Sequence, residues 1–484
     1  MTDSLDFDVV IVGGGISGIN AAYRIQTQAP AGTRYAIFEG RDGIGGTWDL
    51  FRYPGIRSDS DIFTFGFEWN PWPMQGTMAL GPDIRDYLRQ SAQSAGIDEH
   101  IRLRHKVVSA NWSSSERCWE LAVCVDGEEK PRAYRARFLL LGTGYYDYDT
   151  PLQTVIPGIE SFKGKVIHPQ FWPRDYDARD KNIVVIGSGA TAVTIVPAVA
   201  PEAQHVTMLQ RSPTYIFPLP QHPKLASLLF SMLPRSLAAR FNRFLWILQS
   251  YLMVLMCRSF PTLAKRFIRR ANMKLLPPQI PWDPHFKPRY NPWEQRFCAS
   301  PDGDFFAALR SGKASVVTDT IDTVTPDSIK LTSGAVLHPD TIVTATGLKL
   351  RFGGKIQFSM DSQPIDTAHR FAWKASMLED LPNVFFSVGY EDASWTLGAD
   401  CAAQLMTRLL CEASKNKATV VMPHLDKPDE MDVKPMLTLS STYLKNVTGQ
   451  LPKGGTGVWR PRSNYLADLY AAKWGDIKTG LLLS

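Results

Sequence analysis

The sequence predicts an α/β protein with two Rossmann-like dinucleotide-binding domains, the second of which carries a helical insert. An apolar strand, a glycine-rich turn and a helix follow one another twice, first at 7–25 and again at 181–200. Two further apolar stretches, 138–146 and 341–350, have the composition of buried strands that end in glycine turns and close the two nucleotide-binding units.

The expected division of the chain follows from these elements. With 484 residues the chain has room for two or three domains. We expect the first domain over 1–150, the second over 151–374, and a return segment to the first domain over 375–484. The helical insert of the second domain is expected at about 218–290.

Composition narrows the class of protein. Hydrophobic residues make up 44% and charged residues 21%, which is close to the globular average. The six cysteines are scattered, with no CxxC pair and no Cys/His cluster at metal-ligand spacing, so we expect neither a metal site nor a dithiol redox centre. The acidic N-terminus runs directly into a strand and lacks the features of a signal peptide, which indicates a cytoplasmic protein.

The first glycine motif is Gly13-x-Gly15-x-x-Gly18. The first glycine allows the tight turn, the second lets the backbone approach a pyrophosphate, and the third permits close packing of helix on strand. The following strand ends in Glu39, at the distance where an acid binds the ribose hydroxyls of a dinucleotide. The alternative is a glycine turn with a purely structural role.

The second motif is Gly187-x-Gly189-x-x-Ala192, and the strand after its helix ends in Arg211 and Ser212. A cation and a hydroxyl at this place suit the 2′-phosphate of NADP, which an acid would repel. The motif therefore favours NADPH, and the alternative is that Arg211 is a solvated charge at the end of a strand. Two dinucleotide sites in one chain imply electron transfer from NADPH to a tightly held second cofactor, for which FAD is the natural candidate.

Two longer motifs carry a family resemblance. FKGKVIHPQFWP fits the pattern FxGxxxHxxxWP through Phe162, Gly164, His168, Trp172 and Pro173. GGTWDLFRYPGIRSD fits GGxWxxxxYPGxxxD through Gly45, Gly46, Trp48, Tyr53, Pro54, Gly55 and Asp59. In these motifs the chain resembles the class B flavoprotein monooxygenases, and specifically the Baeyer–Villiger type. The related flavin-containing monooxygenases of amines and sulfides share the first pattern but usually lack the terminal Trp-Pro.

The resemblance implies an FAD- and NADPH-dependent enzyme that uses O2 through a flavin peroxide. Such an enzyme converts ketones to esters or lactones and oxygenates sulfides or thiocarbonyls. FAD would be held by Gly13, Gly15, Ser17, Gly18, Glu39, Thr47, Trp48, Asp49, Leu50, Arg57, Ser58, Asp59 and Val107. NADPH would be held by Gly187, Ser188, Gly189, Ala190, Thr191, Ala192, Val193, Arg211 and Ser212.

Asp59 and Arg296 would form the catalytic pair of the family. An arginine suits the reaction because its guanidinium stays protonated and presents several donors in a fixed fork to a developing oxyanion. Asp59 would set the position of the Arg296 guanidinium. The alternative interpretation is that Arg296 forms a surface ion pair. The lysine that usually precedes this arginine is replaced by Gln295, so selection of NADPH would depend on Arg211.

Two other positions have competing interpretations. His168 could act as a general base, but its neighbours Phe162, Trp172 and Pro173 favour a packing residue that couples domain motion to NADPH binding. A helix that begins near Trp395 could direct its N-terminal amides at the flavin, or be an ordinary capped helix.

The insert concentrates the positive charge of the chain. Residues 221–290 contain twelve Lys or Arg and one acid, a surplus of +11 that leaves −5 for the rest. The apolar run 244–256 is shorter than the roughly 20 residues that span a bilayer. It either touches an anionic membrane peripherally or packs over the pocket mouth. Without a nucleic-acid-binding motif, the expected partners are O2 and a small lipophilic ketone or sulfide.

Two other functions compete with a monooxygenase. A flavin-dependent disulfide reductase has a similar domain plan but needs a redox-active cysteine pair, and the sequence has none at suitable spacing. A flavin-binding membrane scaffold without turnover is suggested only by the basic insert.

Overall fold

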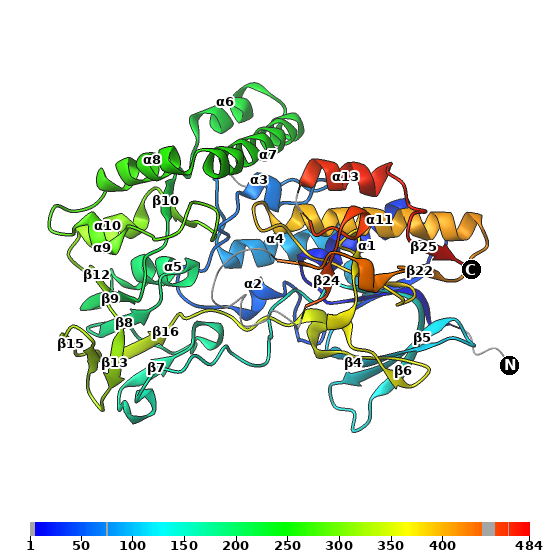
Figure 1. Ribbon diagram of the computed structural model, residues 1–484, viewed down its shortest axis with the longest axis horizontal. Coiled ribbons are helices and arrows are strands. Elements are labelled where there is room, and N and C mark those ends of the chain that lie inside the picture. Colours follow the sequence, from blue (N-terminus) through cyan, green and yellow to red (C-terminus); the bar gives the residue numbers. More distant parts are fainter. Residues whose placement is uncertain (1–4, 74–75, 438–450, 463) are drawn as a thin grey trace.

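The computed structural model describes residues 5–73, 76–437, 451–462 and 464–484, and two β-sheets divide it into two lobes that lie side by side (Figure 1). The first lobe contains the beginning and the end of the described chain. The second lobe is formed by the middle of the chain, between two parts of the first.

The sheet of the first lobe is built around β1 (Phe7–Val12), whose last four residues are buried because parallel strands flank it on both sides. These neighbours are β2 (Tyr35–Phe38) and β6 (Arg132–Leu141), and β5 (Cys118–Val125) and β4 (His105–Ser113) extend the sheet from β6 in antiparallel fashion. Shorter strands complete it: β3 (Ile101–Arg102), β17 (Gln357–Met360), β18 (Gln363–Pro364), β19 (Ala372–Trp373), β20 (Met377–Leu378) and β21 (Val384–Phe386).

Helices cover this sheet. α1 (Ile16–Gln28) follows β1, and α11 (Trp395–Lys415), which is buried over most of its length, packs along α1. The other helices are α2 (Thr47–Leu50), α3 (Ile62–Phe65), α4 (Gly81–Ser94) and α13 (Tyr465–Lys473). Two small antiparallel pairs, β22 (Val421–Pro423) with β25 (Leu481–Leu483) and β23 (Lys434–Pro435) with β24 (Lys453–Gly454), hold the C-terminal part.

The second lobe contains a five-stranded parallel sheet in the order β12-β9-β8-β16-β7. Its strands are β7 (Lys165–Ile167), β8 (Asn182–Ile186), β9 (His205–Gln210), β12 (Ala314–Thr318) and β16 (Thr341–Thr344). α5 (Ala190–Val199) and α10 (Asp304–Arg310) pack on it, and β13 (Ile321–Val324), β14 (Ile329–Leu331) and β15 (Val336–Leu337) form a separate meander. This is the second nucleotide-binding unit that the sequence predicts.

The chain re-enters the first sheet earlier than expected. β17 lies parallel to β4, and β18 and β19 belong to the same sheet. These strands lie before the expected boundary at residue 374 and are too short to stand out in the sequence as part of a sheet. The second lobe ends between β16 and β17.

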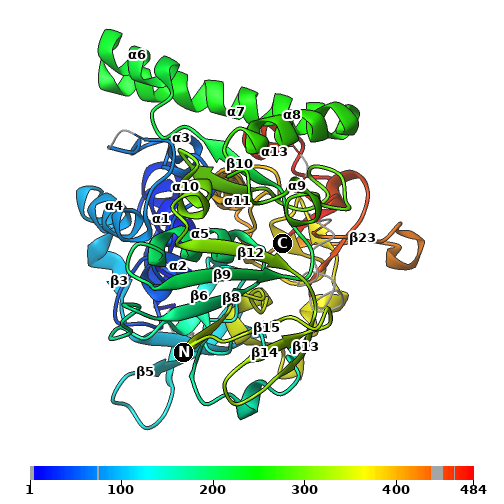
Figure 2. The same cartoon turned by 90° about the vertical axis from the view of Figure 1, so that its left-hand side faces the viewer.

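The helical insert forms a layer above the second sheet, across one edge of the molecule (Figure 2). This layer consists of α6 (Lys224–Met232), α7 (Arg235–Ser259) and α8 (Pro261–Met273), whereas the short α9 (Trp282–His285) lies against β12 of the second sheet (Figure 2). β10 (Ile216–Leu219) before it pairs with β11 (Cys298–Pro301) after it, so the insert leaves and returns at one place. Among the described helices none is individually long and apolar enough to cross a bilayer. α7 and α8 meet that criterion only as a pair bent by 114°.

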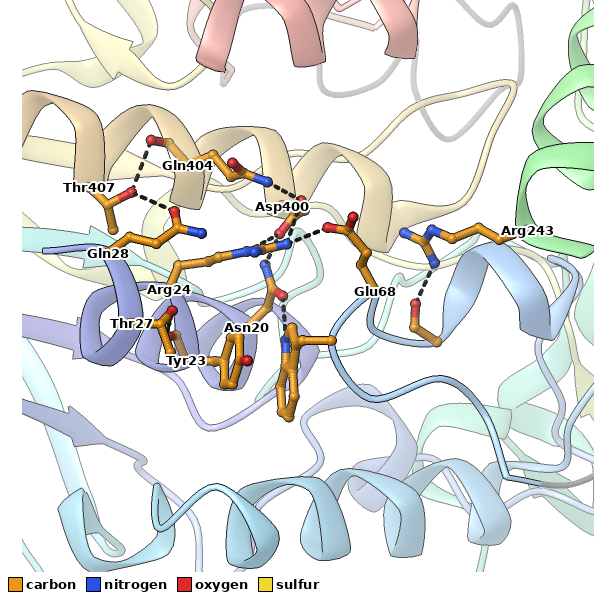
Figure 3. Close-up of polar contacts among 12 residues, drawn as sticks. Asn20, Tyr23, Arg24, Thr27, Gln28, Glu68, Arg243, Asp400, Gln404 and Thr407 are labelled. Atoms are coloured by element: carbon orange, nitrogen blue, oxygen red, sulfur yellow. Dashed lines mark hydrogen bonds and ion pairs between the residues drawn. The ribbon is translucent and has the colours of Figure 1, made fainter. Parts of the chain in front are cut away.

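A buried ionic network joins α1 to α11 (Figure 3). Arg24 of α1 lies 2.8 Å from Asp400 of α11 and 2.8 Å from Glu68, and Asn20 and Gln404 each donate a hydrogen bond of 2.9 Å to Asp400. Burial alone would raise the pKa of the Asp400 carboxyl, but Arg24 and the two amides outweigh it and hold that pKa below its usual value. The network fixes the helix that begins at Trp395 against the helix of the first glycine turn.

Replacing Arg24 should therefore destabilise the protein strongly. Arg24→Leu leaves Asp400 buried without its cation, and we expect the free energy of unfolding to fall by about 3–5 kcal/mol in a urea titration with excess FAD. Arg179→Leu removes an exposed ion pair with Asp177 and is the control, for which the midpoint should not change. Equal midpoints for Arg24→Leu and the unmodified protein would show that the network is dispensable.

Candidate active site

A cavity of about 390 Å³ lies between the two lobes, within the size range of small-molecule and cofactor sites. Its walls come from the β1–α1 turn, residues 45–60, the segment 142–149 after β6, the start of α5, and Arg296. The residues that the sequence assigns to the site and that line this cavity are Gly13, Gly15, Ser17, Glu39, Thr47, Trp48, Arg57, Ser58, Asp59, Val107, Ala190, Thr191 and Arg296.

The first glycine turn has the geometry that a pyrophosphate requires. Gly13 has φ +108°, and a Cβ there would lie 2.5 Å from the carbonyl oxygen of Gly142. At Gly18 a Cβ would lie 1.9 Å from the carbonyl oxygen of Gly13, so helix and turn touch at this point. At Gly15 the nearest atom would be the Cα of Gly46, at 3.7 Å. The first and third glycines thus serve the fold, whereas the second leaves room for a ligand.

Glu39 is held in place at the end of β2. Its two carboxylate oxygens accept hydrogen bonds from the backbone N–H groups of Gly14 (2.7 Å) and Arg41 (3.0 Å). Burial raises the pKa of this carboxyl, while the two N–H donors act to lower it. Asp49 does not line the cavity; it is buried and pairs with Arg41 at 2.7 Å, so it positions the loop. Glu39 therefore has the fixed orientation needed to bind a ribose.

The second glycine turn repeats this design. Gly187 has φ +137°, and a Cβ there would lie 2.2 Å from the carbonyl oxygen of Ala345, at the end of β16. Gly189 is exposed and a Cβ there would meet nothing within 4 Å, whereas Ala192 is fully buried. The surface beside Gly189 is thus open to a second dinucleotide.

Several assigned residues do not line the cavity. Arg211 and Ser212 are exposed just beyond β9, and Val193 is buried in the core of the second lobe. The complete set outside the lining is Gly18, Asp49, Leu50, Gly187, Ser188, Gly189, Ala192, Val193, Arg211 and Ser212.

Asp59 and Arg296 are brought together from opposite lobes. Their nearest oxygen and nitrogen lie 3.7 Å apart, and Arg296 also donates a hydrogen bond of 3.3 Å to the hydroxyl of Ser60. Their side chains are 31% and 35% exposed, so both can be reached from the cavity. A second contact joins the lobes: Arg57 binds Asp304 at 2.5 Å and its guanidinium is only 9% exposed. The pair expected from the sequence is therefore formed.

A smaller cavity of about 80 Å³ adjoins the first, and Arg296 lines both. Its wall is largely apolar and includes Leu350, Phe352 and Phe386. Tyr145 and Trp395 also line both cavities, with their rings stacked 4.6 Å apart. Arg296 thus stands where the larger cavity meets the smaller apolar one.

Aromatic residues that line the larger cavity, Tyr145, Tyr148 and Trp395, are not among the site residues predicted from the sequence. The indole N–H of Trp395 donates to the hydroxyl of Ser17 at 3.0 Å, and the hydroxyl of Tyr148 lies 3.0 Å from that of Thr47. The aromatic run that directly follows the glycine turn after β6 was the available signal for Tyr145 and Tyr148.

His168 lies outside both cavities. Its Nδ1 accepts a hydrogen bond of 3.2 Å from the backbone N–H of Gln170, and burial lowers the pKa of the imidazole. The amide of Gln170 in turn donates to the carbonyl oxygen of Asp147 at 2.7 Å. These contacts favour the packing interpretation of His168. No cysteine lines either cavity, which leaves the disulfide reductase alternative without support in the described site.

Two glycine turns that face open space, a buried acid at the end of β2 and an arginine at the cavity are the features of a dinucleotide-dependent flavoprotein oxidoreductase. The Flavin-binding monooxygenase-like family matches residues 76–245, and an NAD(P)-binding Rossmann-like domain matches 11–76. The chain belongs to the FAD-containing monooxygenases: it is 44% identical to the FAD-containing monooxygenase EthA of Mycolicibacterium smegmatis, over 97% of this chain and 95% of that protein.

Other similar proteins agree. EthA of Mycobacterium tuberculosis is 43% identical, with 99% of this chain and 97% of that protein covered. The probable FAD-binding monooxygenase AlmA of Acinetobacter baylyi is 40% identical, with 98% and 95% covered. Among solved structures, steroid monooxygenase bound to NADP has a TM-score of 0.76 at 19% identity over 99% of each chain. OTEMO with FAD and NADP has a TM-score of 0.75 at 20% identity over all of both chains.

These similarities confirm the predicted fold class, with its FAD and NADP domains, and the prediction of a flavoprotein monooxygenase. The roles of the individual site residues remain predictions that the geometry above makes specific.

The glycine geometry predicts three different outcomes for alanine substitutions. Gly15→Ala should fold normally but lose bound FAD on desalting, because its new methyl group fills only the open space. Gly189→Ala, the matched control, should keep both the fold and the FAD. Gly18→Ala should destabilise the protein itself by about 1–3 kcal/mol, since its methyl group meets backbone. Circular dichroism and flavin absorbance measure these outcomes, and full FAD retention in Gly15→Ala would place the cofactor elsewhere.

Proposed function

We propose that the protein is an FAD- and NADPH-dependent Baeyer–Villiger monooxygenase. It uses O2 to convert lipophilic ketones to esters or lactones, and it also oxygenates sulfides or thiocarbonyls. The observation that supports this most is the Asp59–Arg296 pair, which stands between the lobes at a cavity lined by the first glycine turn and by Ala190 and Thr191 at the start of α5.

The first lobe has the features that FAD needs. The open space at Gly15 accepts the pyrophosphate, and Glu39 accepts hydrogen bonds from the ribose hydroxyls. Val107 lines the cavity beside β2 and is assigned to the adenine. Thr47, Trp48, Arg57 and Ser58 also line the cavity. When it is bound, reduced FAD supplies electrons to O2 and makes one oxygen atom available for transfer.

The second lobe offers a matching site for NADPH. The pyrophosphate would lie at Gly189 and the N-terminus of α5, where backbone N–H groups and the helix dipole favour an anion. Arg211 and Ser212, exposed at the end of β9, would bind the 2′-phosphate. Since Gln295 replaces a cation near the active site, Arg211 carries most of the discrimination between NADPH and NADH.

Arg296 has the central role among the residues of the chain. Its guanidinium stays protonated at any working pH and can donate to the oxyanion that forms when oxygen adds to a ketone. Asp59, at 3.7 Å, and Ser60, at 3.3 Å, hold this side chain at the edge of the cavity. Asp59 is thus a positioning residue, although it also lines the cavity.

The apolar compartment behind Arg296 determines the class of substrate. Leu350, Phe352 and Phe386 offer a surface to the hydrocarbon part of a ketone or sulfide, while the polar group stays beside the guanidinium. We further propose that the insert, residues 221–290, contacts a membrane peripherally. Such lipophilic substrates concentrate in membranes.

A product analysis tests the reaction and the role of Arg296 together. The unmodified enzyme should consume one NADPH and one O2 for each ketone, and the product mass should rise by one oxygen atom. Arg296→Ala should keep FAD and still oxidise NADPH, but release hydrogen peroxide in place of ester. Losing a principal oxyanion donor lowers the rate of ester formation by about 100- to 1000-fold.

Two further variants serve as controls for that experiment. Asp59→Ala should show a milder form of the same defect, because it acts through the arginine. Arg296→Lys keeps the positive charge but loses the several N–H donors of the guanidinium. Its rate of ester formation should lie between those of the unmodified enzyme and Arg296→Ala. Ester formation at a near-normal rate in Arg296→Ala would assign the reaction to another cation, and a lack of any oxygenated product from the unmodified enzyme would refute the proposed activity.

Coenzyme choice is tested at Arg211. Arg211→Ala should raise the KM for NADPH much more than that for NADH, because only NADPH carries the 2′-phosphate. Steady-state kinetics with both coenzymes measure this. Lys313→Ala, at the far end of the neighbouring strand β12, removes a cation of the same lobe and should leave the ratio unchanged. Parallel changes in the two KM values for Arg211→Ala would exclude it as the phosphate contact.

A further inference from the structure

Although Trp246 packs inward on Phe63, the long insert helix α7 has many of its large apolar residues on the outside. Six of them, spaced three or four positions apart, are each at least 42% exposed: Leu237, Phe241, Phe244, Leu248, Leu252 and Leu255. The residues that α7 buries are small or polar, namely Ala238, Ala239, Asn242, Val254 and Cys257. An ordinary surface helix shows the opposite arrangement. The outward stripe therefore does not serve the packing of this chain.

The neighbouring helices continue the stripe. Leu228 and Met232 of α6 and Leu263 and Phe267 of α8 are all more than half exposed. α6, α7 and α8 form one layer at the edge of the molecule in both views (Figures 1 and 2). A continuous exposed apolar surface of this extent marks an interaction site.

The charge of this layer has one sign. Between 224 and 273 there is no acidic residue, and exposed cations accompany the stripe at Arg235, Arg240, Arg258, Arg266, Arg269 and Arg270. An apolar stripe flanked by cations complements a surface that offers anionic headgroups beside hydrocarbon. The 25 residues of α7 extend for about 37 Å, long enough to lie along such a surface.

The inner side of the layer is fixed to the first lobe. The guanidinium of Arg243 donates to the carbonyl oxygens of Phe63 (2.9 Å) and Gly66 (2.8 Å) at the end of α3. Arg258, at the other end of α7, lies 3.5 Å from Asp392, three residues before Trp395. These contacts keep the apolar stripe facing outward and tie it to the segment that carries Trp395.

We propose that α6, α7 and α8 bind flat to an anionic lipid membrane, with the stripe of α7 inserted at the level of the headgroups. Membrane binding would give the enzyme access to lipophilic ketones and sulfides, and this purpose rests on the proposed function. A second copy of the chain is the less suitable occupant, because two layers with the same positive charge would repel each other.

Vesicle binding tests the proposal on the full-length holoenzyme. Flotation with vesicles of equal parts phosphatidylglycerol and phosphatidylcholine should recover the protein at low salt, and pure phosphatidylcholine should recover much less. Arg266→Gln/Arg269→Gln/Arg270→Gln should weaken binding to the anionic vesicles by roughly 100-fold, at about fivefold for each cation. Phe244→Gln/Leu248→Gln should weaken binding at both low and high salt, since it removes the apolar part.

Matched controls lie at the opposite end of the second lobe. Lys163→Gln/Lys181→Gln/Lys330→Gln removes the same charge, and Val155→Gln removes an apolar side chain that is 93% exposed; neither should change binding. No recovery of the unmodified protein at low salt, or equal weakening by variants and controls, would overturn the proposal. So would a dimer in sedimentation velocity that Phe244→Gln/Leu248→Gln converts to a monomer.

The membrane proposal and the proposed function can fail separately. All variants should oxidise NADPH with a water-soluble ketone at the unmodified rate when vesicles are absent, because the exposed layer lies outside both cavities. Normal turnover without vesicle binding would overturn only the membrane inference. Vesicle binding without oxygenated product would overturn the proposed reaction and leave the membrane inference supported.

Discussion

The site depends on a close contact between a glycine turn and the end of a neighbouring strand, which occurs once in each lobe. In each lobe the first glycine of the turn lies against the carbonyl end of a neighbouring strand, Gly13 against Gly142 and Gly187 against Ala345. A side chain at either glycine would push the turn away from that strand, and with it the helix whose N-terminus receives the phosphates. The second glycine of each turn has no such neighbour. Backbone contact thus fixes the turn and leaves free space at its second glycine, which we assign to the cofactor.

Contacts between segments that are distant in the sequence position the rest of the active site relative to these turns. Arg24 and Asp400 join the helix of the first turn to α11, and the indole of Trp395 at the start of α11 reaches back to Ser17. Arg296 stands just before β11, which is aligned by its pairing with β10 on the other side of the insert. Arg296, the cation that we assign to the reaction, is therefore placed by the second lobe, while its partner Asp59 belongs to the first.

The features that local sequence determines could be predicted, and those that depend on distant contacts could not. The glycine turns, Glu39 and the helical insert follow from spacing, composition and strand ends, whereas the pairing of Asp59 with Arg296 was implied by the family motif. The stacked pair of Tyr145 and Trp395, and the apolar cavity beside it, join segments about 250 positions apart, which one sequence cannot bring together. The chain returns to the first sheet before residue 374 through β17, a short strand whose partner β4 lies far away in the chain.

The insert belongs to neither lobe alone. Its ends, at β10 and β11, are packed in the core of the second lobe, whereas Arg243 and Arg258 hold its long helix to Phe63, Gly66 and Asp392 of the first. Together with the Arg57–Asp304 ion pair, these contacts cross between the lobes on the side where Asp59 meets Arg296. Any rotation of one lobe against the other must therefore strain the insert or break one of these contacts. The contacts of Arg243 and Arg258 that orient the outward stripe of α7 thus also hold the insert of the second lobe to the first lobe, to which Asp59 belongs.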